Sequence, residues 1–330
     1  MRRRLVTLGA LSLTLACGEV GPSWAPIATD GVAPRWGHVA LVDVARDRMI
    51  VVGGENGNVA LDDVLVLDLG TLAWSHLAVA NSPRARTDFA AAIDASRDRL
   101  ITVGGRSGLA TSIADVWSLD LATNRWSPLP NGPSARHDVS AVTDGAHLWV
   151  FGGAGELLQS LDDLWELDLA TDAWRLLPAP GDHPAARTSV AFAFFDGALW
   201  MHGGHDALTA YHDSWRYVLT DQRWERLSPP GNTAAAAHFG QAFDVQCAML
   251  VMSGGDNLDN FDVGFTDGFL LGATPRFVRL PASVQPPPRD HASLIVDPVR
   301  HRLVLYGGGA NGDGLGTLGD AWIRPLDACP

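Results

Sequence analysis

The sequence predicts an all-β fold, a six-bladed β-propeller of four-stranded antiparallel blades, closed by an N-terminal strand that completes the last blade. Three observations predict it: a recurring glycine pair, a recurring aspartate before an alternating stretch, and a spacing of about fifty residues between copies. The chain has 330 residues, of which 47% are hydrophobic and 18% charged, so it can bury a large core. Its 35 glycines and 20 prolines suit many short strands joined by turns.

The two markers define six tandem units. Each glycine pair ends an apolar run, where the backbone must bend sharply and a side chain would clash. The pairs end at Gly54, Gly105, Gly153, Gly204, Gly255 and Gly308. The marker aspartates are Asp63, Asp115, Asp163, Asp213, Asp267 and Asp320. Six copies at this period predict one propeller domain over residues 17–330.

Each unit divides into four strands, as the third unit illustrates. VSAVTD predicts the first strand and AHLWVFGG the second, with a tight turn at Asp144 and Gly145. The polar loop AGELLQS follows, DLWELDL alternates as the third strand, and AWRLLP is the fourth. A sheet buried between two neighbours needs bulky side chains at fixed places. They are Leu65, Trp117, Trp165, Trp215, Phe269 and Trp322 two residues after the markers, and Trp74, Trp126, Trp174 and Trp224 eleven after.

The sixth unit has three strands instead of four. It begins near Arg289 and reaches Trp322, but no counterpart of AWRLLP follows. The segment SWAPIATDGVAPR, which starts at Ser23, reads like AWRLLPAPGDHPAAR of the third unit. We therefore expect Trp24 to begin a strand that pairs with the open edge of the last blade and closes the ring.

These motifs resemble the kelch repeat. The resemblance rests on the glycine pair, the alternating stretch and the tryptophan near position eleven, and it covers about residue 22 to the end. The fifth unit departs from the pattern, with Val278 in place of the tryptophan and Ala237 in place of an arginine that opens the other first strands. The tyrosine usual in the strand after the glycine pair is replaced by Leu, Trp or Phe. We expect blade five to be the least regular.

The N-terminal segment MRRRLVTLGALSLTLACGEV has the layout of a secretory signal peptide. Three arginines precede an apolar run that is too short to span a bilayer. TLAC resembles the bacterial lipobox, which implies removal of residues 1–16 and lipid attachment to Cys17. We expect an exported protein, held at the outer membrane or cell surface by a lipid anchor alone. The alternative is plain secretion, into the periplasm or beyond.

Charge and cysteine content limit the partners. The formal net charge is −13 and no basic stripe is present, so nucleic-acid binding is excluded. We expect a monomer. Apart from Cys17, only Cys247 and Cys329 remain, and two cysteines in an exported chain could pair. The sequence does not place their sulfur atoms, so the pairing stays open.

The candidate binding surface is the face that carries the loops after the second strands. These loops vary most between units, and variable loops on a rigid ring are where specificity usually resides. Kelch propellers commonly bind partners there, so the resemblance implies a module that binds a protein or a glycan. The candidate residues at the channel rim are Arg35, His38, Arg86, Arg136, His137, Arg187, His205, His238, Arg289 and His291.

The arginines admit two interpretations. They could form a cationic rim that binds carboxylate or phosphate groups. Alternatively, each pairs with an aspartate or a loop carbonyl of its own or the next blade, which the repetition in five units favours. Two other functions stay open: a carbohydrate-active enzyme of the epimerase or oxidase type, for which His38, His137, His238 and His291 lie in suitable segments, and a structural surface protein.

We assign neither a catalytic residue nor a metal ligand from the sequence. Copper oxidases similar to galactose oxidase need a tyrosine crosslinked to a cysteine, and Cys247 has no fitting partner here. The HxxH spacing of His202 and His205, with His212 nearby, spans a glycine pair and is not helical. Two oxygen-rich loops could hold calcium, although neither has a full ligand register. They contain Asp256, Asp259 and Asp262, and Asn311 and Asp313.

Overall fold

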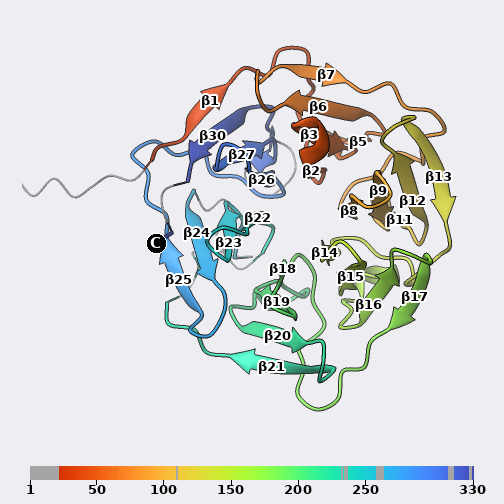
Figure 1. Ribbon diagram of the computed structural model, residues 1–330, viewed down its shortest axis with the longest axis vertical. Coiled ribbons are helices and arrows are strands. Elements are labelled where there is room, and N and C mark those ends of the chain that lie inside the picture. Colours follow the sequence, from red (N-terminus) through yellow and green to blue (C-terminus); the bar gives the residue numbers. More distant parts are fainter. Residues whose placement is uncertain are drawn as a thin grey trace, which may run out of the picture.

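A computed structural model describes residues 22–108, 111–231, 233, 237–257, 264–310, 316–326 and 329–330. Six four-stranded antiparallel sheets stand around a central axis as the blades of a propeller (Figure 1), which confirms the predicted fold class. Within these ranges the helical segments are two 3-10 turns, η1 (Val44–Arg46) and η2 (Glu156–Leu158), and neither could cross a membrane. The predicted leader, residues 1–16, and Cys17 lie outside the described residues.

In each blade the chain runs from the axis outward. The innermost strands are β2 (Val39–Asp43), β8 (Ala90–Asp94), β14 (Ser140–Thr143), β18 (Ala191–Phe195), β22 (Gly240–Asp244) and β26 (Ser293–Asp297). The second strands are β3 (Arg48–Val52), β9 (Arg99–Val103), β15 (His147–Phe151), β19 (Ala198–His202), β23 (Met249–Ser253) and β27 (Arg302–Tyr306). The third strands are β6 (Val64–Asp68), β12 (Val116–Asp120), β16 (Leu164–Asp168), β20 (Ser214–Val218), β24 (Thr266–Leu270) and β30 (Ala321–Pro325). The outer strands are β7 (Trp74–His76), β13 (Arg125–Leu129), β17 (Ala173–Leu176), β21 (Arg223–Leu227), β25 (Arg276–Arg279) and β1 (Ala25–Ile27).

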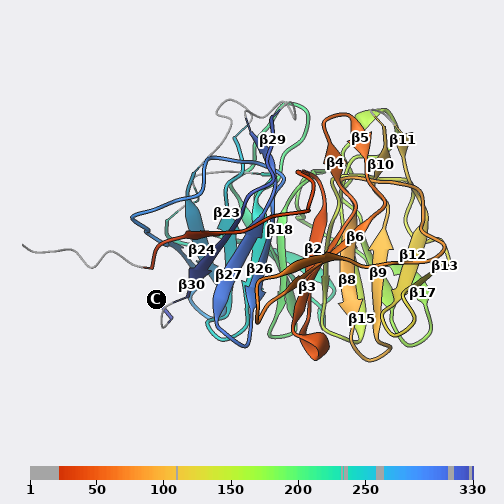
Figure 2. The ribbon, with the colours of Figure 1, turned by 90° about the horizontal axis from the view of Figure 1, so that it is seen from above.

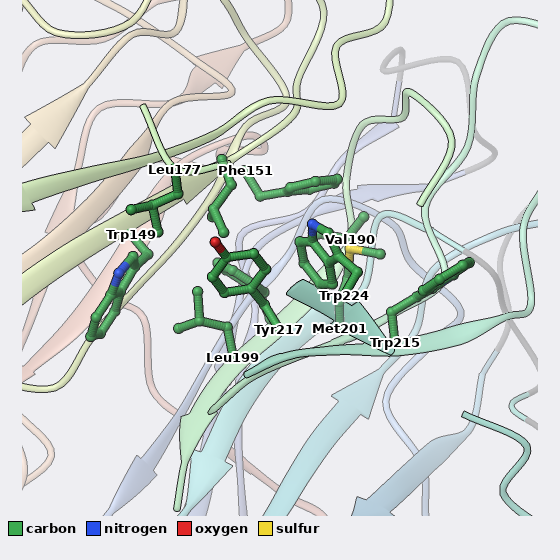
Figure 3. Close-up of a cluster of buried hydrophobic side chains, with 11 residues drawn as sticks. Trp149, Phe151, Leu177, Val190, Leu199, Met201, Trp215, Tyr217 and Trp224 are labelled. Carbon is green, nitrogen blue, oxygen red and sulfur yellow. The ribbon is translucent and has the colours of Figure 1, made fainter. Parts of the chain in front are cut away.

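The core lies between neighbouring blades, because both faces of every sheet are covered. Between the third and fourth blades, Trp149 and Phe151 of β15 pack toward Tyr217 and Trp224 of the next blade (Figure 3). Phe151 meets the ring of Trp224 edge-on, with ring centroids 5.5 Å apart. A buried tryptophan contributes several kcal/mol gross at about 25 cal/mol per Å² of apolar area. The large residues that recur in the sequence therefore stabilise the contacts between neighbouring blades.

The ring closes as predicted. Strand β1 pairs antiparallel with β30, and Pro26 lies opposite Trp322. Trp24, which immediately precedes β1, is buried against Leu303 and Leu305 of the last blade. The first described strand and the last one thus share a sheet, so the outer edge of β30 is paired.

In blade five, two positions that the sequence pattern assigned are wrong. The marker position is Phe265, because its carbonyl accepts the hydrogen bond from Gly254 N that Asp63 O accepts from Gly53 N in blade one. Asp267 is therefore two residues beyond the marker position. The large residue opposite Phe269 is Phe277 and not Val278, and their rings stack with centroids 4.5 Å apart.

The position of Ala237 is also shifted by one residue. Ala237 bridges Asp256 as Thr188 bridges His205, so it is the counterpart of the residue after the recurring arginine. The arginine position is then 236, which is alanine and lies outside the described residues. Blade five thus lacks the arginine and the aspartate together, and the sequence pattern misplaced the marker because an aspartate stands two residues after Phe265.

Cys247 and Cys329 form a disulfide, with their Cα atoms 5.1 Å apart. Cys247 lies in the turn between β22 and β23 of blade five, and Cys329 follows β30 of blade six. The pairing that the sequence left open therefore ties the last two blades together.

Candidate functional site at the mouth of the channel

The short hairpins after the second strands lie on one face of the disc. Three of these loops form two-stranded hairpins, which stand at the top of Figure 2, with η1 at the opposite side. They are β4–β5 (Glu55–Asn56 and Val59–Ala60), β10–β11 (Arg106–Ser107 and Thr111–Ser112) and β28–β29 (Gly309–Ala310 and Gly316–Thr317). We call this side the loop face. The innermost strands begin at this face, so the residues just before them surround its centre.

The recurring arginines lie below the loop face and are not exposed on it. Arg136 is 1% exposed, and its guanidinium donates to both carboxylate oxygens of Asp163 at 2.6 and 2.8 Å and to the Gly152 carbonyl at 2.9 Å. The same pairing recurs as Arg35–Asp63, Arg86–Asp115, Arg187–Asp213 and Arg289–Asp320. These five arginines therefore do not form the cationic rim. They have the alternative arrangement, in which each arginine pairs with an aspartate of its own blade.

The glycine pairs explain why that arrangement repeats. At Gly53 (φ 59°) and Gly54 (φ 94°) the chain adopts left-handed conformations that glycine favours. A Cβ at Gly53 would lie 2.8 Å from the Arg86 carbonyl of the next blade, and Gly54 N donates to that carbonyl at 2.9 Å. The backbone of each arginine is thus hydrogen-bonded to the preceding blade, while its side chain pairs with the aspartate of its own blade.

Two residues before each innermost strand, the backbone turns through a left-handed conformation. The φ values lie between 46° and 61°. The six positions are Gly37, Asp88, Asp138, Ser189, His238 and His291. Backbone hydrogen bonds run from one of these positions to the next, such as Asp88 N to Gly37 O at 2.8 Å and Asp138 N to Asp88 O at 2.8 Å. We call this set the mouth ring. It places six side-chain positions from six blades around one small cavity.

The cavity inside the mouth ring has a volume of about 130 Å³ and is lined by all six ring residues. Two carboxylates, Asp88 and Asp138, come from blades two and three, and two imidazoles, His238 and His291, come from blades five and six. The imidazole rings stack, with centroids 4.0 Å apart. The mouth therefore combines acidic and basic groups in a space the size of a few water molecules.

His238 lies at the centre of a chain of polar contacts. Its Nδ1 is 2.7 Å from a carboxylate oxygen of Asp256, and its Nε2 is 3.0 Å from Nε2 of His205. His205 donates from Nδ1 to the Asp206 carbonyl at 2.9 Å, because a carbonyl can only accept. Burial and the neighbouring His238 lower the pKa of His205. The Asp206 carbonyl therefore holds a proton on His205 Nδ1, and Nε2 faces His238.

His291 is surrounded by acidic groups. Its Nδ1 lies 3.2 Å from Asp290 Oδ1. Burial alone would lower its pKa, but the carboxylates of Asp290, Asp88 and Asp138 raise the pKa of His291 to about 9. Burial would likewise raise the pKa of Asp138, whereas the imidazoles around it hold that pKa below its usual range. With nothing else bound, these groups carry opposite charges and stabilise one another.

The remaining predicted histidines occupy different places. His38 is buried behind the ring, and burial holds its pKa well below the usual value. His137 contacts the Ser112 hydroxyl at 2.9 Å and lies beside Asp138. His202 is buried between Ser214 and Thr233, away from His205, so the HxxH spacing does not form a site.

The calcium predictions are only partly covered by the structure. Asp256 is 3% exposed, and its carboxylate faces His238. Asp259, Asp262, Asn311 and Asp313 lie outside the described residues, so these two loops stay predictions.

The sequence reasoning missed the carboxylates of the mouth. Asp88 and Asp138 stand two residues after Arg86 and Arg136, at the ring position of their blades. Asp290 and Asp256 flank the ring histidines. Aligning the units on the arginine would have identified the ring as one column, although not the direction of its side chains.

The loop face also exposes apolar side chains. Leu157 is fully exposed, and Leu158 and Leu208 are 67% and 92% exposed. Leu157 and Leu158 both have positive φ, at 58° and 61°, a conformation that leucine rarely adopts. Val59 and Phe265 add exposed apolar surface on two other blades. We call these five residues, which belong to four blades, the exposed apolar loop residues.

Fold and repeat define a class, the β-propellers whose blades are braced by arginine–aspartate pairs and joined by glycine pairs. Comparison with family models is more specific. The model described as the KLHDC2/KLHL20/DRC7 Kelch-repeats domain matches residues 20–132 and 129–308. The chain belongs to this kelch-repeat family, whose propellers are generally protein-interaction modules.

Curated relatives share the repeats but are much longer proteins. The chain is 34% identical over 133 residues to Acyl-CoA-binding domain-containing protein 4 of Arabidopsis thaliana, a match that covers 39% of this chain and 20% of that protein. It is 25% identical over 271 residues to the Leucine-zipper-like transcriptional regulator 1 homolog of Drosophila melanogaster, covering 81% of this chain and 23% of the relative. The chain thus spans about a fifth of the length of these relatives.

Proposed function

We propose that this chain is an exported, monomeric binding module that recognises a protein through its loop face. The observation that carries the proposal is the set of exposed apolar loop residues, above all Leu157 and Leu158. Exposed apolar side chains on a folded domain favour association, and adjacent leucines in a costly backbone conformation point to a function at that loop.

The size of the central cavity supports the same role. Sites that enclose a small organic ligand usually have a volume of about 300 to 1,000 Å³. The cavity of about 130 Å³ inside the mouth ring is smaller than that range. This favours recognition by the loops over a carbohydrate-active enzyme, and a protein partner over an enclosed glycan.

The proposal is tested by replacing loop leucines with serine. We expect the variant Leu157→Ser, Leu158→Ser, Leu208→Ser to lose a partner that the parent protein captures from envelope extracts. The matched control is Leu176→Ser, because Leu176 is 57% exposed but lies on the outer strand β17. The captured partner is then purified and titrated against both variants. Equal affinity for both would contradict the proposal, and so would turnover of sugars by the parent protein.

We also propose that the protein is exported and lipid-anchored through Cys17. The basic and apolar N-terminal segment supports this, and the Cys247–Cys329 disulfide suits an oxidising compartment. Cys17→Ser should release the protein from membranes into the soluble fraction. Unchanged membrane association of the variant would contradict lipidation, and a parent protein that stays in the cytoplasm would contradict export.

A further inference from the structure

We propose that the mouth of the channel binds one divalent transition-metal ion, such as Zn²⁺, through Asp138, His238 and His291, with His205 in contact with His238. The residues come from blades three to six and meet only in the folded ring. Asp138, His238 and His291 each offer a ligand atom within 4.8 Å of the other two. Two or three imidazoles with one carboxylate are a donor set typical of zinc and of iron(II).

The contact between His205 and His238 adds a second argument. His205 carries its proton on Nδ1, where the Asp206 carbonyl accepts it. His238 directs its Nδ1 toward the Asp256 carboxylate, and in the neutral imidazole this places the proton on Nδ1 as well. Two Nε2 lone pairs then face each other at 3.0 Å, and either a proton or a metal ion between them relieves the contact.

A metal ion satisfies that geometry. At zinc–nitrogen distances of about 2.0 to 2.1 Å, two ligand nitrogens lie roughly 2.9 to 3.4 Å apart, depending on the coordination angle. The observed 3.0 Å falls within this range. The Thr188 hydroxyl, 3.1 Å from His205 Nε2, can donate to the His205 carbonyl instead, at 3.4 Å.

The residues around the ligands support the same conclusion. Metal-binding histidines almost always donate their second ring N–H to a carboxylate or a carbonyl, which fixes the ring and its tautomer. All three imidazoles have such a partner: Asp206 O for His205, Asp256 for His238 and Asp290 for His291. Asp88 adds a further carboxylate, and its Oδ1 has no hydrogen-bond partner among the described residues.

The test is a zinc titration of the untagged full-length protein after chelator treatment, by calorimetry and by metal analysis after dialysis. We expect one Zn²⁺ per chain, and visible absorption bands when Co²⁺ replaces it. His238→Asn, His291→Asn and Asp138→Asn should each weaken binding by about 100-fold or more. Asparagine tolerates the positive φ of these positions, so the ring should still fold.

Two further variants distinguish a preorganised metal site from nonspecific attraction of the cation to negative charge. Asp256→Asn and Asp290→Asn should weaken zinc binding by about 10- to 100-fold, because they orient the imidazoles without touching the ion. Ser189→Gly is the matched control, since Ser189 occupies the mouth ring without a ligand group, and it should bind as the parent does.

Three outcomes would overturn the inference. The first is that zinc binds no more tightly than about 100 μM. The second is that His238→Asn and His291→Asn leave the zinc stoichiometry unchanged. The third is that Ser189→Gly loses as much zinc affinity as the ligand variants do. Melting temperatures of all variants without metal show whether a loss reflects unfolding. The inference does not depend on the proposed protein partner.

Discussion

At the scale of single residues, the arginine–aspartate pair is the unit that repeats. The guanidinium is buried, while the carboxylate keeps contact with water, as for Arg136 at 1% and Asp163 at 27% side-chain exposure. In blades three, four and six the same aspartate also accepts the indole N–H of the tryptophan two residues on, such as Trp165 at 2.7 Å. One carboxylate therefore fixes an arginine from the inner edge and a tryptophan of the third strand.

We predict that Arg136→Met lowers the free energy of unfolding by about 2 to 3 kcal/mol, because it leaves the Asp163 carboxylate without its partner. The double variant Arg136→Ala, Asp163→Phe carries the residues that blade five has at these positions. Its loss of unfolding free energy should be at least about 1 kcal/mol smaller than the sum of the losses in the two single variants. Urea denaturation measures each value. Arg175→Met, which removes an exposed pair with Glu166, should cost under about 1 kcal/mol. Additive single costs would contradict the coupling.

At the scale of elements, strand β1 matters more than its three residues suggest. Without it, β30 would present an unpaired edge, and the buried face around Trp24 would be open. The register of this strand followed from its likeness to the other outer strands. The register of blade five did not, because phenylalanine replaces the marker aspartate at position 265 and Asp267, two residues later, fits the sequence pattern instead.

We predict that Trp24→Ala destabilises the protein by about 3 to 5 kcal/mol, the usual cost of deleting a large buried aromatic side chain. Thermal and urea unfolding measure the loss, and the variant should also aggregate more readily through the loosened edge. Leu176→Ala on the outer strand β17 is the control and should change stability little, because that side chain is 57% exposed. Equal effects of the two substitutions would contradict the closing role of β1.

At the scale of the whole molecule, three devices keep the ring closed: the apolar interfaces between blades, β1 on the last blade, and the disulfide between blades five and six. The glycine pairs and the backbone hydrogen bonds of the mouth ring connect each blade to the next.

We predict that reduction, or Cys247→Ser, lowers stability by about 2 to 4 kcal/mol, because the bond closes a long loop of the unfolded chain. The sequence separation is 82 residues. Denaturation with and without reductant measures the difference. Reductant should have no further effect on Cys247→Ser, and a parent protein that is equally stable with and without reductant would contradict a structural role.

The sequence by itself determined the fold class, the number of blades and the closing strand. Each depends on a local pattern repeated along the chain, and burial between identical neighbours forces the same residue types into the same places. Tertiary structure alone decided that Cys247 meets Cys329, that the arginines turn inward, and that Asp138, His238 and His291 lie close together at the mouth. These residues come from different blades, and only the closed ring, with its left-handed turn before each innermost strand, determines which side chains face one another.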